Sequence, residues 1–224
     1  MKQKILGFLK KYKHALLPLL YFPFYMLAFS YLERTVTTNF ALVHMRLDDY
    51  IPFIEYFVIP YYLWFPYIAV TVITFIFLDK RDYYKLCITL GTGMTLFLLI
   101  SFLIPNGHDL RPLTFERNNI FTTLIKTMYT VDTPTNLFPS IHCYNSLMAH
   151  TAIMENETLK KHKGIQIISL LLCVSIVLST MFIKQHSVFD VFTALALSVI
   201  MYLLVYRPGI NTCFKHFIHK RQGS

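Results

Sequence analysis

Long apolar segments dominate this chain and restrict its possible folds more than any other feature. Several of them, such as 165–183, approach the roughly 20 residues that a helix needs to cross a hydrocarbon core about 30 Å thick. Hydrophobic residues make up 55% of the 224 residues and charged residues only 15%, and a soluble protein of this size could not bury so much apolar surface. A transmembrane barrel would show alternating apolar and polar residues, and these runs do not alternate. We therefore predict an all-α, polytopic membrane protein.

The apolar runs predict six transmembrane helices in one bundle, so that residues 1–224 form a single membrane-embedded domain. The fourth predicted helix is short for a full crossing. We place the six helices at about 15–32, 56–78, 86–104, 139–154, 164–183 and 188–206.

The segments between these helices differ in character. The connection 33–55 is polar, and its periodicity does not decide whether it contains a short interfacial helix over 40–47. Residues 79–85 are expected to form a tight charged turn. Residues 119–129 are expected to form a short helix that folds back over the membrane, after the turn signal Pro105-Asn106-Gly107.

The distribution of basic residues predicts the orientation of the chain. With six helices, 15 of the 21 Lys and Arg residues fall on the side of the two termini and six on the other side. Because Lys and Arg favour cytoplasmic loops, both termini are predicted to be cytoplasmic. Residues 1–14 are basic and amphipathic, and we expect them to lie on an anionic membrane surface. The excess of basic residues is thus explained without nucleic acid, and membrane lipids are the expected surroundings.

The cysteines indicate neither a zinc site nor a disulfide framework. Cys87, Cys143, Cys173 and Cys213 are scattered, and no pair has CxxC spacing. No second cluster of carboxylates accompanies the candidate histidines described below. We therefore expect no metal and no cofactor. The sequence leaves the oligomeric state open.

His186 stands at the beginning of the last apolar run. Ionisable groups in apolar segments are costly and are therefore functional candidates. Its imidazole could attack phosphorus if its other nitrogen is held by an acceptor, and Asp190 lies one helical turn away. The alternative reading is that Ser187 and Asp190 form a capping box at a helix start. The two interpretations are compatible.

His142 stands at the beginning of the fourth predicted helix, where Pro139 suits the first helical position. Such a helix start directs N–H groups and a positive dipole end at an anion, and Ser140 adds a further donor. His142 could protonate a leaving alkoxide and then activate water. A lone histidine at this depth is also compatible with a packing role.

Arg111 is the best candidate for binding phosphate, because its planar guanidinium matches two phosphate oxygens. Lys184 and Arg117 are supplementary candidates, although isolated loop cations are more often solvated. The predicted topology places Arg111, His142 and His186 at the outer face of the membrane. Three residues far apart in the sequence would then lie at one depth.

Three motifs resemble those of the type 2 phosphatidic acid phosphatase superfamily, which includes membrane lipid phosphatases, undecaprenyl-diphosphate phosphatases and related transferases. The matching motifs cover about 104–191 and are Arg111-Pro112, Pro139-Ser140-Ile141-His142 and Ser179-x6-His186-x3-Asp190. The resemblance implies a catalytic core over about 86–206. By position it implies that His186 is the nucleophile, Asp190 orients it, His142 is the acid and base, and Arg111 and Ser140 contact phosphate.

This sequence departs from the family pattern at two expected cations. Ile104 stands where the family has a lysine, and Thr180 stands where it has an arginine; Ile141 replaces a glycine. A phosphomonoester carries close to two negative charges, so the loss of two cations should weaken its binding. The remaining histidine, histidine and aspartate set is also similar to the sphingomyelin synthase and inositol-phosphorylceramide synthase branch, whose substrate is a singly charged diester.

Three functions follow from these observations. The favoured one is a metal-independent lipid phosphatase at the outer face of a bacterial plasma membrane, acting through a phosphohistidine on a phosphatidate-type or isoprenyl phosphate or diphosphate. The first alternative is a transferase that moves a phosphodiester headgroup between lipids. The second alternative is a membrane scaffold or transporter without catalysis.

Overall fold

The computed structural model describes residues 12–207 of the chain. Most of the predicted amphipathic segment 1–14 and the basic tail after residue 207 lie outside the described residues. Within the described range the chain is mainly helical, and only two strands of two residues each, β1 (Ala41–Leu42) and β2 (Asn106–Gly107), pair in parallel. The predicted all-helical class is therefore confirmed apart from this small sheet.

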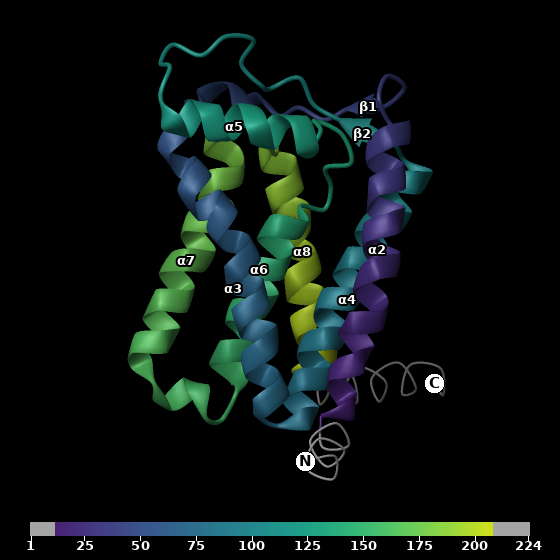
Figure 1. Cartoon of the computed structure of the whole chain (residues 1–224), viewed down its shortest axis with the longest axis vertical. Helices are drawn as coiled ribbons and strands as arrows, with labels where there is room; N and C mark the ends of the chain where they lie inside the picture. Colours follow the sequence, from purple (N-terminus) through teal and green to yellow (C-terminus); the bar gives the residue numbers. More distant parts are fainter. Residues whose placement is uncertain (1–11, 208–224) are drawn as a thin grey trace, which may run out of the picture.

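The helices follow the apolar runs of the sequence closely (Figure 1). Each long helix lies within a few residues of the predicted position, except that α4 begins earlier. The α-helices are α2 (Leu16–Thr35), α3 (Val58–Phe77), α4 (Lys80–Leu103), α5 (Ile120–Val131), α6 (Ile141–Glu155), α7 (Lys163–Phe182) and α8 (Val188–Val205). Short 3-10 helices are η1 (Lys13–Ala15), η2 (Arg46–Tyr50), η3 (Glu55–Phe57) and η4 (Leu159–Lys161).

Five helices are long and apolar enough to cross a membrane, namely α2, α3, α4, α7 and α8. The protein is thus a helical membrane protein. The sixth predicted span is α6, whose 15 residues extend about 22 Å and fall short of a hydrocarbon core of about 30 Å. The count of six spans and the cytoplasmic location of the termini stay predictions.

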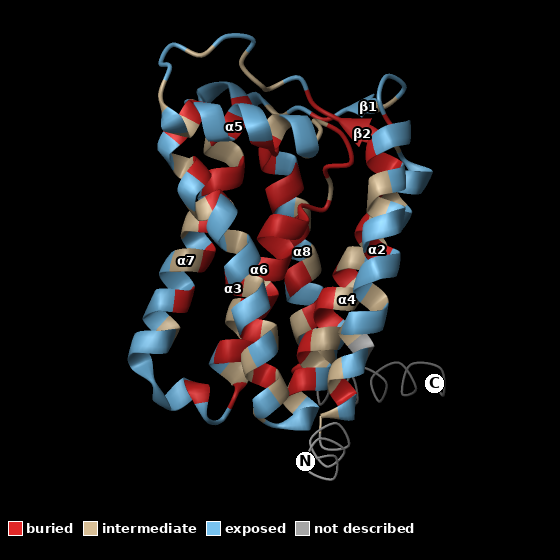
Figure 2. Cartoon of the chain, in the orientation of Figure 1, coloured by how far each residue is buried: buried red, intermediate tan, exposed pale blue. Residues whose placement is uncertain are grey.

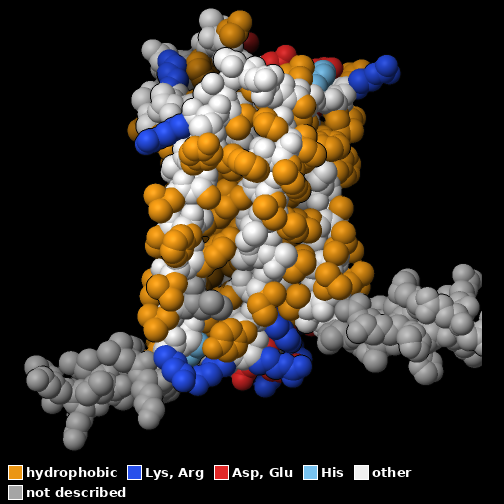
Figure 3. All heavy atoms as spheres, turned by 90° about the vertical axis from the view of Figure 1, so that its right-hand side faces the viewer, with side chains coloured by type: hydrophobic (Ala, Val, Ile, Leu, Met, Phe, Trp, Pro, Cys, Tyr) orange, Lys and Arg blue, Asp and Glu red, His pale blue; other side chains and the backbone are white. Residues whose placement is uncertain are grey.

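The short helix α6 lies at the centre of the bundle and contacts α3, α4, α7 and α8. Ten of its residues are buried, and Figure 2 shows that buried residues concentrate on α6 and in the segments near its beginning. The longer helices expose many Leu, Ile, Phe and Val side chains, and hydrophobic side chains cover the side of the bundle drawn in Figure 3. This pattern suits a bundle in which long helices face lipid and a short one is enclosed by protein.

One end of the bundle, which we call the histidine end, contains the beginnings of α6 and α8. Helix α5 lies across this end, as Figure 1 shows. Its N-cap is Asn119, whose side chain accepts the Thr122 N–H at 3.0 Å. The predicted short helix is therefore confirmed, and its position over the membrane stays a prediction.

One local prediction is wrong, and one question that the sequence left open is answered. Residues 79–85 do not form a turn, because Asp79 caps α4 by accepting the Arg81 N–H at 2.8 Å and the charged residues after it form the first helical turns. The sequence left open whether 40–47 contains a helix; the structure has strand β1 there, and the 3-10 helix η2 begins only at Arg46. Ala41 pairs with Asn106 of β2 instead, so a contact between distant segments determines the structure there.

The segment that leads into α6 is held by two buried polar residues from other elements. Glu33 of α2 accepts the Asn136 side-chain amide at 2.8 Å and the Thr133 N–H at 2.9 Å. The Asn106 side-chain oxygen accepts the Leu137 N–H at 2.7 Å. Because such buried groups are costly when unpaired, these contacts determine where α6 begins.

Helices α4 and α6 approach each other at Gly93, which generates a prediction. A Cβ atom at this position would lie 1.9 Å from Cε1 of the buried Tyr144, whose hydroxyl donates to the Thr89 carbonyl at 2.7 Å. We expect Gly93→Ala to lower the free energy of unfolding by about 1–3 kcal/mol through overpacking, measured by unfolding of the protein in detergent. The matched control is Gly91→Ala, since nothing lies within 4 Å of its Cβ position; it should be neutral or stabilise by up to about 1 kcal/mol. Equal effects of the two substitutions would contradict this packing.

Candidate active site

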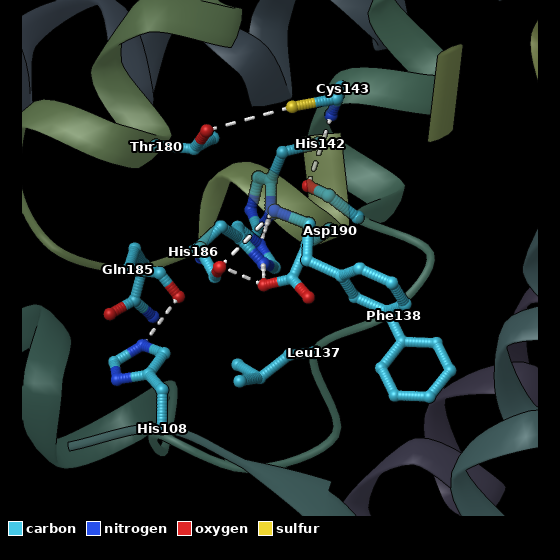
Figure 4. A network of polar contacts seen from close by, with 12 residues as sticks. His108, Leu137, Phe138, His142, Cys143, Thr180, Gln185, His186 and Asp190 are labelled. Atoms are coloured by element: carbon cyan, nitrogen blue, oxygen red, sulfur yellow. Dashed lines mark hydrogen bonds and ion pairs between the residues drawn. The ribbon is translucent and has the colours of Figure 1, made fainter. Parts of the chain in front are cut away.

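His186 and Asp190 lie side by side at the beginning of α8. The Nδ1 atom of His186 is 3.2 Å from Oδ2 of Asp190, a contact drawn as a dashed line in Figure 4. Both side chains are buried. An ionised carboxylate can only accept, so Nδ1 carries the proton and Nε2 presents a lone pair. The pair therefore has the arrangement of an oriented nucleophile.

The capping box predicted at the same place is also present. The Ser187 N–H donates to Asp190 Oδ2 at 2.9 Å, and the Ser187 hydroxyl accepts the Phe189 N–H at 3.1 Å. The same carboxylate oxygen thus serves the helix start and His186. The two interpretations of these residues hold together.

His142 meets His186 directly. The distance from His142 Nδ1 to His186 Nε2 is 3.4 Å. The His142 ring is packed between aromatic side chains of α3, with ring centroids 4.6 Å from Tyr61 and 4.5 Å from Trp64. The Tyr61 hydroxyl donates to the Asp132 carboxylate, which determines the position of the ring against His142. The bundle therefore brings together two histidines that are 44 positions apart.

Ser140 is the N-cap of α6, and its hydroxyl accepts the Cys143 N–H at 3.4 Å. Pro139 therefore precedes the cap, and the prediction that it occupies the first helical position is wrong, because Ser140 still has non-helical dihedral angles. Within residues 12–207, the N–H groups of Ile141 and His142 have no protein acceptor. Two free donors and the positive end of α6 thus adjoin the histidine pair, an arrangement suited to an anion.

Arg111 reaches the segment before His186 but is largely occupied by protein acceptors. Its guanidinium donates to the carbonyls of Tyr129 at 3.2 Å and Asp132 at 2.5 Å, and to Oε1 of Gln185 at 2.6 Å. It also lies 4.0 Å from the centre of the Tyr129 ring. Arg111 therefore stabilises the C-terminal end of α5 and holds it against Gln185, the neighbour of His186.

The two supplementary cations do not point to the histidine pair. Lys184 donates from Nζ to the Asp48 carbonyl at 2.8 Å, and burial lowers its pKa. Arg117 is exposed and pairs with Glu55 at 3.2 Å, which raises the pKa of Arg117. The structure thus brings together His186, Asp190, His142 and Ser140, with Arg111 beside them, and leaves these two cations with other partners.

His108 and Gln185 are two further polar residues near the histidine pair that are not among the candidates named from the sequence. His108 Nδ1 accepts the Leu110 N–H at 3.1 Å, so its Nε2 carries a proton and donates to the Gln185 carbonyl at 3.0 Å. His108 is buried, and this burial lowers its pKa to about 4. The position of His108 beside a turn signal only weakly indicated that it would bond to the segment before His186. The uncharged Gln185 gave no indication of such a contact.

Within residues 12–207, no three His, Cys, Asp or Glu side chains are placed so that they could bind one metal ion. The site instead offers a nucleophilic nitrogen, a second imidazole beside it and a helix start. These groups can form and cleave a bond to phosphorus by acid and base chemistry alone. The absence of a metal from the reaction stays a prediction.

Comparison with known protein families identifies one match. Residues 109–209 match the family model of the PAP2 superfamily, so the resemblance to the type 2 phosphatidic acid phosphatases is confirmed. No match was found among curated proteins or among solved structures. The matched range contains the site residues His142, His186, Asp190, Ser140 and Arg111.

The burial of His108 generates a prediction about pH. Because its folded-state pKa of about 4 lies below the ordinary value of 6.5, folding favours the neutral form. The stabilisation is present above pH 6.5 and is lost as the pH falls from 6.5 towards 4, up to about 3 kcal/mol at about 1.4 kcal/mol per pH unit. We expect the unfolding temperature of the wild type to fall more steeply over this range than that of His108→Gln, which keeps a donor for Gln185. Parallel pH dependence of the two proteins would contradict the assignment.

Proposed function

We propose that this chain, whose residues 109–209 match the family model of the PAP2 superfamily, is a lipid phosphatase that acts through a phosphohistidine on His186. The match to the PAP2 superfamily supports a lipid phosphatase or phosphotransferase type of activity. The phosphohistidine mechanism is supported by the two contacts of the His186 ring. One ring nitrogen lies 3.2 Å from Asp190, and the other lies 3.4 Å from His142. An oriented nucleophile and an adjacent acid are the two groups that the reaction requires.

In the first step His186 Nε2 attacks phosphorus and the bond from phosphorus to the lipid oxygen breaks. The contact between the two rings is replaced by the substrate, and His142 donates a proton to the leaving alkoxide. Asp190 stabilises the positive charge that His186 acquires. The phosphoryl oxygens face the free N–H groups of Ile141 and His142 at the start of α6.

In the second step a water molecule attacks the phosphohistidine. His142, now without its proton, accepts a proton from the water, and the bond between phosphorus and His186 breaks. Inorganic phosphate leaves, and both histidines return to their initial protonation states. The proposed substrates are phosphatidate-type or isoprenyl phosphates and diphosphates, because the site lies at one end of a bundle whose sides face lipid.

One observation favours a second candidate, the transfer of a phosphodiester headgroup to a lipid hydroxyl. The family cations are replaced by Ile104 and Thr180, and the supplementary cations Lys184 and Arg117 bind Asp48 and Glu55 instead. Arg111 is the one cation beside the pair within residues 12–207, and it is shared with three protein acceptors. A singly charged diester requires less positive charge than a phosphomonoester.

We further propose that the histidine end faces the outside of a bacterial plasma membrane. The asymmetry of Lys and Arg between the two ends of the six predicted spans supports this orientation. Phosphate would then be released outside the cytoplasm, and the substrate headgroup would enter from the outer leaflet.

The first test concerns the two histidines. We expect His186→Ala to abolish turnover and His142→Ala to lower kcat by at least about 100-fold, because each substitution removes one of the two reacting groups. Release of phosphate from lipid substrates by purified protein measures this, and elution from a sizing column shows that the variants fold. The control is His162→Ala, which changes an exposed histidine at the opposite end of the bundle and should leave activity unchanged. Full activity of His186→Ala would refute the mechanism.

The second test concerns the acceptor. We expect inorganic phosphate to be released from a lipid phosphomonoester or diphosphate, and chelators to have little effect on the rate, since no metal takes part in the proposed steps. The measurement uses a lipid panel in which free phosphate and labelled headgroup are quantified together. Transfer of the label to a second lipid without release of phosphate would favour the transferase instead.

A further inference from the structure

We propose that Asp48, in the connection between α2 and α3, is a positioning residue that holds His186 and Asp190 in their reactive arrangement. The inference rests on the proposed function, because Asp48 would act through the nucleophile. Asp48 lies outside the matched range 109–209 and is 139 positions away from Ser187, which it contacts. Neither the family motifs nor local sequence patterns point to it.

The Asp48 carboxylate is bound to the two residues that follow His186. Its side chain is buried, with 2% of the residue exposed. Oδ2 accepts the Ser187 hydroxyl at 2.6 Å, and Oδ1 accepts the Val188 N–H at 2.8 Å. Oδ2 also accepts the Met45 N–H at 2.8 Å, which anchors the carboxylate in its own loop. Bonds to an ionised acceptor are roughly twice as strong as neutral ones, so these contacts hold the start of α8 firmly.

Asp48 also holds the chain on the other side of His186. Its main-chain carbonyl accepts Nζ of Lys184 at 2.8 Å, and Lys184 has a left-handed backbone with φ of 53°. Asp48 thus bonds to Lys184 before His186 and to Ser187 and Val188 after it. The segment 184–188 cannot shift relative to α2 and α3 without breaking these bonds.

The Ser187 hydroxyl connects Asp48 with the catalytic pair. Since its proton goes to Asp48, its lone pairs remain for the Phe189 N–H, which it accepts at 3.1 Å. The Ser187 N–H donates to Asp190 Oδ2, the oxygen that faces His186. A displacement of about 1 Å in such an arrangement can lower the rate about 100-fold. The geometry thus gives Asp48 an influence on the nucleophile without contact with the substrate.

Asp48 also affects which helix start is free to bind phosphate. Its negative charge lies at the positive end of α8, where it compensates the helix dipole, and it takes up the Val188 N–H. The N–H groups of Ile141 and His142 at the start of α6 stay unoccupied. The anion is therefore directed to α6, beside His142, and away from α8.

The test compares Asp48→Ala and Asp48→Asn with the neighbouring control Asp49→Asn. Asp49 is exposed and bonds to His44 at 2.8 Å, so its substitution should leave activity unchanged. For Asp48→Ala we expect kcat to fall about 100-fold with KM nearly constant, and for Asp48→Asn a smaller fall, because the amide can still accept the Val188 N–H. If Asp48→Ala does not fold, the near-isosteric Asp48→Asn alone provides the comparison of kcat with the wild type.

A second measurement distinguishes positioning from a merely structural role. In protein with isotope-labelled histidine, the Nδ1 proton resonance of His186 is identified by its loss in His186→Ala. We expect Asp48→Asn to shift or remove this resonance and Asp49→Asn to leave it unchanged. If Asp48→Asn lowers stability but leaves both kcat and the resonance as in the wild type, the proposal is wrong. If the wild type has no activity, the proposed function fails, and the resonance still shows whether Asp48 positions the pair.

Discussion

A buried hydrogen bond between His186 and Asp190 sets the requirement on which the rest of this structure depends. A carboxylate enclosed by protein is strongly destabilising unless donors surround it. Here the donors are the His186 ring and the Ser187 N–H, both on Oδ2, whereas the buried Oδ1 has no hydrogen-bond partner within residues 12–207. Each donor must itself be held in place, and the loops at the histidine end provide the bonds that do so. The hydrogen bonds that orient His186 are thus the same ones that stabilise the buried Asp190 carboxylate.

The position of the site follows from the short central helix. Because α6 is enclosed by α3, α4, α7 and α8, its beginning lies inside the bundle, where water has limited access. The turn between α7 and α8 brings His186 to the same depth, and α5 covers this end (Figure 1). A polar site can therefore form in a chain whose long helices are almost entirely apolar. The exposed apolar sides leave lipid as the surrounding solvent, which suits a substrate with a hydrocarbon tail.

The partners of the cations limit the substrates that the site can bind. Arg111, Lys184 and Arg117 are residues of the right type for phosphate, yet each is bound to protein carbonyls or carboxylates. Besides these cations, the backbone N–H groups at the start of α6 are a source of positive potential. In the proposed function, phosphate would therefore be bound through dipoles more than through ion pairs. The charge of the lipid phosphate group is therefore the property that separates the two proposed activities.

Local sequence patterns were sufficient for the helices and for part of the site. The apolar runs gave the positions of the long helices because hydrophobic length decides which segments cross a bilayer, and the spacing of Ser187 and Asp190 indicated a helix start. The same patterns were wrong for 79–85, where a helix cap decided the structure, and they left 40–47 undecided, where a strand pairing decided it.

The sequence by itself predicted a helical membrane protein that resembles the type 2 phosphatidic acid phosphatase superfamily, and it indicated His142, His186 and Asp190 as candidates. Only the tertiary structure decided that the two imidazoles touch, that Tyr61 and Trp64 enclose one of them, and that Asp48 holds the loop of the other. The physical reason is that these contacts join residues that are tens of positions apart. Helical periodicity describes neighbours within a few turns and carries no information about such pairs.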